Sequence, residues 1–287
     1  MKLTSGNVRF FSVIIPTLNE EKYLPKLLRC LVNQIDKDFE VIVVDGKSED
    51  KTVDAAGNFS DSISSLTILN AVKRNVSYQR NLGAKYAKGK FLVFFDADTQ
   101  IPFNFLSQVH NYLLENRNCN LLTTWMKPDS KSRADQTLIA ITSILIELAK
   151  AINKPFMGGA NVIIKKSIFE KVRGFDEKLK LSEDHDLAQR LLKSKIILHI
   201  LKEPRATISL RRFRREGTIN LLRKYAVATS KLLFEGPITD HLFDYPMGGK
   251  VSRGQKKVNK LKLTRHLNKF QKYFNRINFS QQDNQKI

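Results

Sequence analysis

The 287-residue sequence predicts a Rossmann-like α/β fold, with a mostly parallel central sheet and helices on its faces. Two observations predict it. Continuous apolar runs of strand length, typical of strands buried on both faces, alternate with longer segments of helical periodicity, and the connections between them are short. The chain is 42% hydrophobic and can therefore bury a sizeable core. Such folds bind ligands beyond the carboxyl ends of their strands, so functional residues are expected there.

The elements follow one another in a regular order. Strands are expected at 11–15, 40–44, 66–69, 91–95, 121–125 and 161–164, and a strand pair at 196–200 and 206–210. Helices are expected at 23–32, 77–87, 103–115, 134–152, 182–193 and about 218–234. Asn19 is a candidate N-cap for the first helix, with Glu20 and Glu21 in its first turn.

The charge of the chain is strongly positive and unevenly distributed. The formal net charge is +21, which points to an anionic partner such as nucleic acid, a phosphorylated substrate or a membrane surface. Nearly half of this excess lies in residues 250–287, which hold 11 basic residues and one acidic residue. In that segment Leu263, Leu267, Phe270, Phe274 and Ile277 recur at helical spacing. This pattern is typical of a basic amphipathic helix.

The cysteines and apolar segments exclude several protein classes. The two cysteines, Cys30 and Cys119, provide neither a disulfide framework nor a cysteine-type zinc site, and they favour a reducing, cytoplasmic setting. Residues 1–9 contain no apolar run, so a secretory signal is not expected. The longest apolar stretch, 137–152, is shorter than the roughly 20 residues needed to span a bilayer, so no transmembrane helix is predicted.

Carboxylates follow two of the expected buried strands. Asp45 follows the strand at 40–44, and Asp96 and Asp98 flank Ala97 directly after the strand at 91–95. Asp45 precedes glycine, and a turn is an equally good explanation for it. Two carboxylates one residue apart offer the hard oxygen ligands that Mg²⁺ or Mn²⁺ prefers. An Asp-x-Asp motif is weak evidence alone, and its context decides its meaning.

Four motifs give that context. VIIPTLNEE, VIVVDGKSEDKT, QRNLGAKYAKGKFLVFFDADT and GGANVIIKKSIFEKVRGFDEKLKLSEDHDLAQRL follow one another along the chain. In order and approximate spacing they resemble the family 2 glycosyltransferases, over about residues 10–215. The resemblance implies the GT-A fold of nucleotide-diphospho-sugar transferases. It also implies a catalytic domain over 1–235, with a nucleotide-binding half at about 10–100 and an acceptor half at about 120–215, and a basic helical C-terminal extension over 236–287.

The resemblance further implies roles for individual residues in binding the donor. The residues expected to bind the nucleotide sugar are Thr17, Glu20, Asp45, Arg80, Asp96, Ala97, Asp98, Arg211 and Arg212. Asp98, with Asp96, is expected to hold Mg²⁺ or Mn²⁺ against the diphosphate. The alternatives are a solvated helix position for Arg80 and a solvated basic surface for Arg211 and Arg212.

The same resemblance implies the catalytic and acceptor residues. Asp184, with Glu183 beside it, matches the general base that takes the proton of the acceptor hydroxyl. Gly158, Gly159 and Asn161 match an acceptor-binding loop. Without the other motifs, Glu183 and Asp184 would be interpreted as the acidic first turn of a helix capped by Ser182, and the glycines as a β-turn.

These observations favour a metal-dependent, inverting hexosyltransferase. It would move one sugar from a nucleotide-diphosphate sugar, with UDP the expected nucleotide, to an acceptor hydroxyl of a lipid-linked or cell-envelope glycan. The alternatives are a sugar-1-phosphate nucleotidyltransferase, which the PTLNEE segment disfavours, and a basic nucleic-acid-binding protein, for which recognition motifs are lacking. Nucleic acid is not expected as a partner. The basic tail predicts peripheral attachment to an anionic membrane surface at its inner face, with a soluble tail as the alternative.

Overall fold

The computed structural model describes residues 9–217 apart from 154, 156, 158, 159 and 180, and also residues 220, 221, 223, 224, 227 and 248. The chain divides into two compact units. Residues 9–177 and 183–210 belong to the first unit, which contains the sheet, and residues 211–217 belong to the second. The predicted domain boundary at 235 and the extension over 236–287, apart from residue 248, fall outside the described residues and stay predictions.

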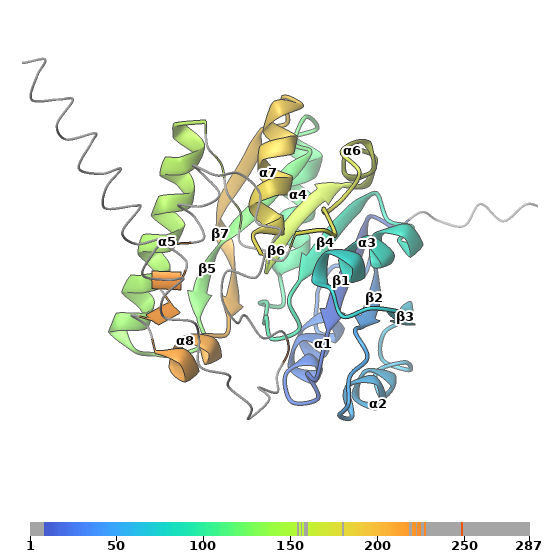
Figure 1. Cartoon of the computed structure of the whole chain (residues 1–287). Coiled ribbons are helices and arrows are strands. Elements are labelled where there is room, and N and C mark those ends of the chain that lie inside the picture. The colour runs from blue at the N-terminus through green and yellow to red at the C-terminus, as the bar shows by residue number, and fades with distance from the viewer. Residues whose placement is uncertain are drawn as a thin grey trace, which may run out of the picture. The chain divides into compact units, whose positions relative to one another are not determined.

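In the described residues the first unit is built on a seven-stranded sheet in the order β3-β2-β1-β4-β6-β5-β7 (Figure 1). Strand β6 runs antiparallel to β4 and β5, and the other neighbouring strands are parallel. The mostly parallel sheet is thereby confirmed. The strands are β1 (Phe11–Thr17), β2 (Phe39–Asp45), β3 (Leu66–Asn70), β4 (Phe91–Phe95), β5 (Leu121–Pro128), β6 (Asn161–Lys165) and β7 (Leu198–Ile208).

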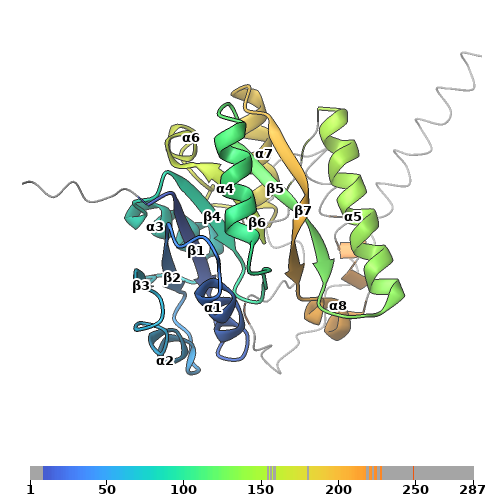
Figure 2. The ribbon, with the colours of Figure 1, turned by 180° about the vertical axis from the view of Figure 1, so that it is seen from behind.

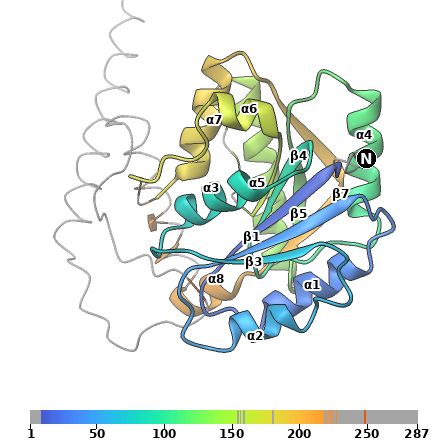
Figure 3. The same cartoon turned by 90° about the vertical axis from the view of Figure 1, so that its right-hand side faces the viewer.

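Helices cover both faces of this sheet (Figures 2 and 3). Helices α1 (Leu24–Val32), α2 (Thr52–Gly57) and α4 (Phe105–Glu115) pack on one face. Helices α3 (Val76–Tyr86), α6 (Lys166–Lys171) and α7 (Glu183–Lys193) pack on the other. Helix α5 (Arg133–Ala151) packs against β5, and α8 (Arg211–Glu216) belongs to the second unit.

Alternating side chains of the central strands fill the two cores. On β1, Phe11, Val13 and Ile15 face the helices α1, α2 and α4, whereas Ile14 faces the opposite side. All four are fully buried, which explains why this strand is apolar at every position from Val13 to Ile15. Burying side chains of this size stabilises the fold by about 1.5–3 kcal/mol each.

The start of the first helix was wrongly predicted. Helix α1 begins at Leu24, with Tyr23 at the N-cap position, so Asn19 does not cap it. Asn19 has a left-handed backbone with φ of 55°, which asparagine tolerates better than most residues. Its Oδ1 accepts a hydrogen bond of 2.7 Å from the Glu49 amide. The side chain is therefore used to join the loops after β1 and β2.

The predicted strand pair at 196–200 and 206–210 was also wrong. The two apolar runs are parts of one strand, β7, which pairs with β5 on both sides of an irregularity in register. Pro204 lies between the two runs and is part of the continuous strand. Because β7 lies at the edge of the sheet, the missing amide of a proline is tolerated there.

No helix among the described residues is long and apolar enough to cross a bilayer. Helix α5 covers 19 residues and has apolar side chains on both its buried and its exposed side. Ile139 and Ile146 are buried, whereas Ile141, Ile144, Leu145 and Leu148 are about half exposed. The apolar run at 137–152 is therefore explained only in part by the core.

Gly83 allows α3 to lie close to the sheet. A Cβ atom on Gly83 would lie 2.5 Å from Cγ2 of Ile14 and 3.2 Å from Cγ2 of Val44. We expect Gly83→Ala to lower the free energy of unfolding by about 1–3 kcal/mol, because the overpacking outweighs the better helix propensity of alanine. Urea unfolding measures this change.

Gly57→Ala is the matched control, because a Cβ atom on Gly57 at the end of α2 would have no contact within 4 Å. We expect its unfolding free energy to stay within about 1 kcal/mol of that of the unchanged chain. A Gly83→Ala chain as stable as the control would contradict the close approach of α3 to β1.

Candidate active site

Two of the residues predicted to bind the nucleotide sugar lie next to each other at the carboxyl ends of β1 and β2. Thr17 and Asp45 are register partners, and the Thr17 hydroxyl lies 3.1 Å from Oδ1 of Asp45. Asp45 also accepts hydrogen bonds from the amide and the hydroxyl of Ser48, at 2.8 and 2.5 Å. Its carboxylate is nearly fully buried and is thereby compensated by three donors. The turn and the ligand-binding interpretations of Asp45 are compatible with this geometry.

Gln79 forms hydrogen bonds to the same two strand ends. This role was not predicted from the sequence. Its Nε2 donates to the carbonyl oxygens of Thr17 and Val44, at 2.8 and 2.7 Å, and the side chain is almost fully buried. Glutamine is common on solvated helix faces, so its presence in α3 gave no signal. Its position directly before Arg80 was the available hint.

Arg80 connects two of the sequence motifs. From α3, its guanidinium reaches Oδ1 of Asp96 at 2.9 Å and Oε1 of Glu183 at 2.8 Å. The side chain is 3% exposed and its Cζ lies 5.2 Å from the centre of the Phe175 ring. The solvated helix position considered for Arg80 is therefore wrong. A planar guanidinium with separate donors is suited to holding two carboxylates at once.

The electrostatics of this group follow from its burial. Burial opposes the charged form of Arg80, but Asp96, Glu183 and Asp184 outweigh this effect and raise its pKa. Burial also raises the pKa of Glu183, to which the nearby Asp184 carboxylate adds, while Arg80 acts in the opposite direction. Arg80 thus remains charged, and its positive charge offsets the repulsion between the neighbouring carboxylates of Glu183 and Asp184 at the start of α7.

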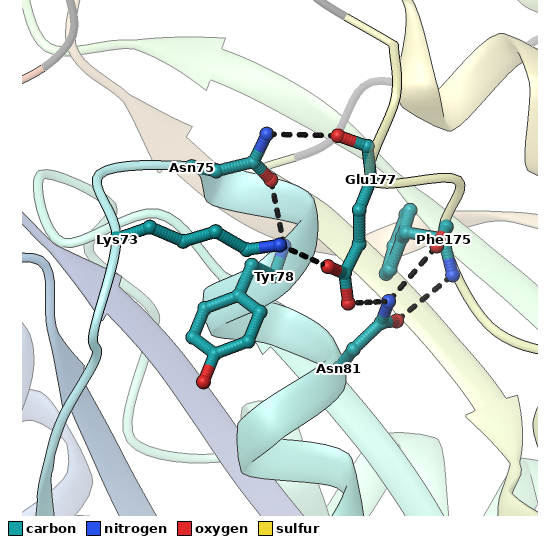
Figure 4. A network of polar contacts seen from close by, with 6 residues as sticks. All are labelled: Lys73, Asn75, Tyr78, Asn81, Phe175 and Glu177. Carbon is teal, nitrogen blue, oxygen red and sulfur yellow. Dashed lines mark hydrogen bonds and ion pairs between the residues drawn. The ribbon is translucent and has the colours of Figure 1, made fainter.

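Figure 4 shows how α3 is docked to the segment that leads toward α7. Asn81 donates from Nδ2 to the Phe175 carbonyl at 2.9 Å and accepts from the Phe175 amide at 2.9 Å. Lys73 pairs with Glu177 at 2.6 Å, and Asn75 donates to the Glu177 carbonyl at 3.1 Å. The side chain of Asn75 also caps α3 by accepting from the Tyr78 amide. These contacts fix the helix that carries Arg80.

The Asp96-Ala97-Asp98 segment forms a turn directly after β4, with the Thr99 amide bonded to the Asp96 carbonyl at 3.0 Å. Ala97 is buried, and the Asp96 side chain is 42% exposed although one oxygen binds Arg80. Asp98 is half-buried. Within the described residues, no three His, Cys, Asp or Glu side chains are grouped to hold a metal ion. Two carboxylates suit a Mg²⁺ or Mn²⁺ ion whose other ligands are phosphate oxygens and water.

Three other predicted residues are described in the first unit, and each is at least half-buried. Glu20 is buried, and its amide donates to the Thr52 hydroxyl at 2.8 Å. Asp184 is half-buried in the first turn of α7, next to Glu183, and its Oδ1 accepts from the His185 amide at 2.9 Å. Asn161 at the start of β6 is fully buried and donates to Oγ1 of Thr124 at 2.6 Å.

Four other predicted residues lie outside the described residues or in the second unit. Gly158 and Gly159 lie outside the described residues. Arg211 and Arg212 are in α8 of the second unit, where both are half-buried. Their roles toward the donor and the acceptor stay predictions.

The chain matches a family model described as Glycosyl transferase family 2 over residues 12–173. Among curated proteins, it is 29% identical over 188 residues to an uncharacterized glycosyltransferase of Haemophilus influenzae, covering 63% of this chain and 61% of that protein. It is 26% identical over 200 residues to the minor teichoic acid biosynthesis protein GgaB of Bacillus subtilis, covering 67% of this chain and 22% of that one. The chain thus spans less than two thirds of the length of these relatives.

Solved structures share the fold. The structure of S. aureus TarS in complex with UDP-GlcNAc matches with a TM-score of 0.57 and 24% identity, over 70% of this chain and 58% of that one. The mannosyltransferase PcManGT from Pyrobaculum calidifontis in complex with GDP-Man and Mn²⁺ matches with a TM-score of 0.60 and 19% identity, over 78% and 65%. The GT-A fold predicted from the sequence is thereby confirmed.

Removing the Arg80 guanidinium should be costly. We expect Arg80→Gln to lower the free energy of unfolding by about 3 kcal/mol, because it leaves Glu183 and Asp96 without their shared cation. The control is Arg74→Gln, which removes an exposed pair with Glu49 and should cost less than about 1 kcal/mol. Urea unfolding of both variants at one pH makes the comparison. An equal decrease in the free energy of unfolding of the two variants would contradict a larger contribution of the buried group to stability.

Proposed function

The chain belongs to glycosyl transferase family 2, and we propose that it transfers one sugar from a nucleotide-diphosphate sugar to a hydroxyl group of a cell-envelope or lipid-linked glycan. UDP is the expected nucleotide, and the reaction is expected to invert the anomeric centre. The acceptor class is supported by the name of the Bacillus subtilis relative, a teichoic acid biosynthesis protein.

The observation that carries the proposal is the buried Arg80 guanidinium between Asp96 and Glu183. Asp96 belongs to the motif expected to bind the donor, and Glu183 is adjacent to the expected general base. Because one side chain contacts both motifs, Asp96 and Glu183 lie close together beyond the end of β4, although they are nearly 90 positions apart in the sequence. A transferase needs its donor site and its general base close to each other in space.

On this proposal Asp184 accepts the proton of the attacking hydroxyl. A sugar hydroxyl is a weak nucleophile at neutral pH, and a carboxylate within hydrogen-bond reach removes its proton as the bond to the anomeric carbon forms. Attack from the side opposite the diphosphate gives inversion in a single displacement. Glu183, bound to Arg80, would hold the first turn of α7 and with it Asp184 in place.

The donor is proposed to lie across the ends of β1, β2 and β4. Thr17 and Asp45 would hold the base and ribose, with Glu20 beside them, and Asp96 and Asp98 would hold Mg²⁺ or Mn²⁺. The metal, when bound, neutralises the charge of the leaving nucleoside diphosphate. Arg80 would act by orienting Asp96, because its guanidinium is already engaged by two carboxylates.

A thermal-shift screen of nucleotide sugars, each with and without Mn²⁺, tests donor binding. We expect one donor, with UDP as its nucleotide, to raise the melting temperature in the presence of Mn²⁺, because a ligand that binds only the folded state stabilises it. Asp98→Ala should lose most of the metal-dependent part of this shift. If no nucleotide sugar stabilises the chain under either condition, the proposed function is wrong.

Exchanging the proposed base should stop transfer but not donor binding. We expect Asp184→Asn to lower the turnover rate by about 10²–10⁴-fold in an assay of nucleoside diphosphate release with acceptor present. Asp186→Asn is the matched control from the same turn of α7. Asp186 pairs with Arg190 at 2.7 Å, so its loss should affect stability far more than turnover. Normal turnover by Asp184→Asn would exclude Asp184 as the base.

We further propose that the basic extension attaches the protein peripherally to the inner face of the membrane. Its 11 Lys and Arg residues would gain about 1 kcal/mol each near an anionic leaflet. A chain lacking residues 250–287 should therefore no longer sediment with vesicles containing phosphatidylglycerol, whereas the full chain should. Neither should sediment with phosphatidylcholine vesicles. Unchanged sedimentation of the shortened chain would refute the attachment.

A further inference from the structure

A recess lies in the first unit beside β5 and β7, on the other side of β4 from β1 and β2. It has a volume of about 650 Å³ and is lined by the end of β5, by the start of α5 and by Gln100, Arg205 and Thr207. This volume falls within the usual range of small-molecule sites. None of the residues to which the family resemblance assigns a role in binding donor, acceptor or metal lines it.

The recess adjoins the Asp96-Ala97-Asp98 turn. Gln100 lies two residues after Asp98 and forms a bridge with Thr207 of β7. The Gln100 amide donates to the Thr207 carbonyl at 2.9 Å, and the Thr207 amide donates to the Gln100 carbonyl at 2.7 Å. The segment that follows the Asp96-Ala97-Asp98 turn thus forms one wall of the recess. A ligand in it would be close to the proposed donor site on the acceptor half of the sheet.

The charge of the recess is positive. Three cationic side chains line it, Lys127, Lys131 and Arg205, against one carboxylate, Asp129. Asp129 accepts a hydrogen bond from the Leu210 amide at 3.1 Å, and Arg205 pairs with the exposed Glu203 at 2.9 Å. In the part of the chain that the structure describes, the ammonium groups of Lys127 and Lys131 form no ion pair. Both are exposed and available to an anion.

Trp125, the only tryptophan of the chain, also lines the recess. Its Nε1 donates to Oε1 of Glu147 on α5 at 2.8 Å, which fixes the orientation of the indole. The Arg205 guanidinium lies 5.4 Å and the Lys202 ammonium 5.6 Å from its ring. An oriented aromatic ring next to cations presents an apolar surface for a sugar ring and positive charge for a phosphate.

We infer that this recess binds a phosphate-bearing sugar of the acceptor. Trp125 would pack against the sugar ring, while Lys127 and Lys131 would bind the phosphate. The inference rests on the proposed function, because it assigns the recess to the acceptor. It makes that function more specific: the acceptor is an anionic, phosphate-containing glycan rather than a neutral one.

Fluorescence of Trp125 provides a direct test with the full chain. Glucose 6-phosphate serves as the probe, with glucose and inorganic phosphate as the comparisons. We expect glucose 6-phosphate to change the fluorescence with a dissociation constant at least tenfold lower than that of either comparison, and to bind more weakly as salt is added. The same dissociation constant for glucose or for inorganic phosphate alone would overturn the inference, as would the absence of any response.

A double variant tests the role of the lysines. Lys127→Gln with Lys131→Gln should weaken glucose 6-phosphate binding about fivefold or more. The control combines Lys85→Gln with Lys171→Gln, two exposed lysines on α3 and α6, and should bind as the unchanged chain does. Equal binding by both double variants would overturn the inference.

Donor-induced thermal shifts of the same proteins separate the two proposals. A chain that is stabilised by a nucleotide sugar but gives no response to glucose 6-phosphate would overturn only the assignment of the recess. A chain that binds glucose 6-phosphate at Trp125 but no nucleotide sugar would keep the recess as a sugar-phosphate site and overturn its role in glycosyl transfer.

Discussion

The Arg80 guanidinium between Asp96 and Glu183 is the interaction on which the rest of the site depends. Placing a cation in the protein interior is costly, and it is tolerated here because two carboxylates compensate it. The same pairing allows Glu183 and Asp184 to lie side by side at the start of α7. Removing the cation is expected to destabilise the chain because it leaves buried charge uncompensated, and while the group is intact each charge restricts where the other two can be.

Helix α3 carries this group and fastens the site with consecutive residues. Gln79 binds the ends of β1 and β2, Arg80 binds Asp96 and Glu183, and Asn81 binds Phe175. Gly83 lets the helix lie against Ile14 of β1. Three adjacent side chains thus hold the ends of β1 and β2, the turn after β4, the start of α7 and the segment before it. This arrangement gives a physical reason for the Gln-Arg-Asn sequence beyond contact with a nucleotide.

The sequence predicted the sheet well because strands buried on both faces must be apolar throughout, as the 91–95 run is. It placed Asp45 and Asp96 at strand ends because both directly follow such runs, whereas Thr17 was singled out by the resemblance to the family. It could not predict what Gln79, Arg80 and Asn81 hold, since their partners lie far along the chain and leave no local pattern. Asn19 was assigned to a helix cap by its position, although it joins two loops. The recess near Trp125 was missed because its lining comes from separate segments.

A double-mutant cycle tests the central claim, that Arg80 and Glu183 act as one unit, most directly. The free energies of unfolding of Arg80→Gln, Glu183→Gln and the double variant are compared with that of the unchanged chain by urea denaturation. The account predicts a coupling free energy of about 1.5 kcal/mol or more, with the double variant less destabilised than the sum of the single ones. Additive losses, within about 0.5 kcal/mol, would contradict it.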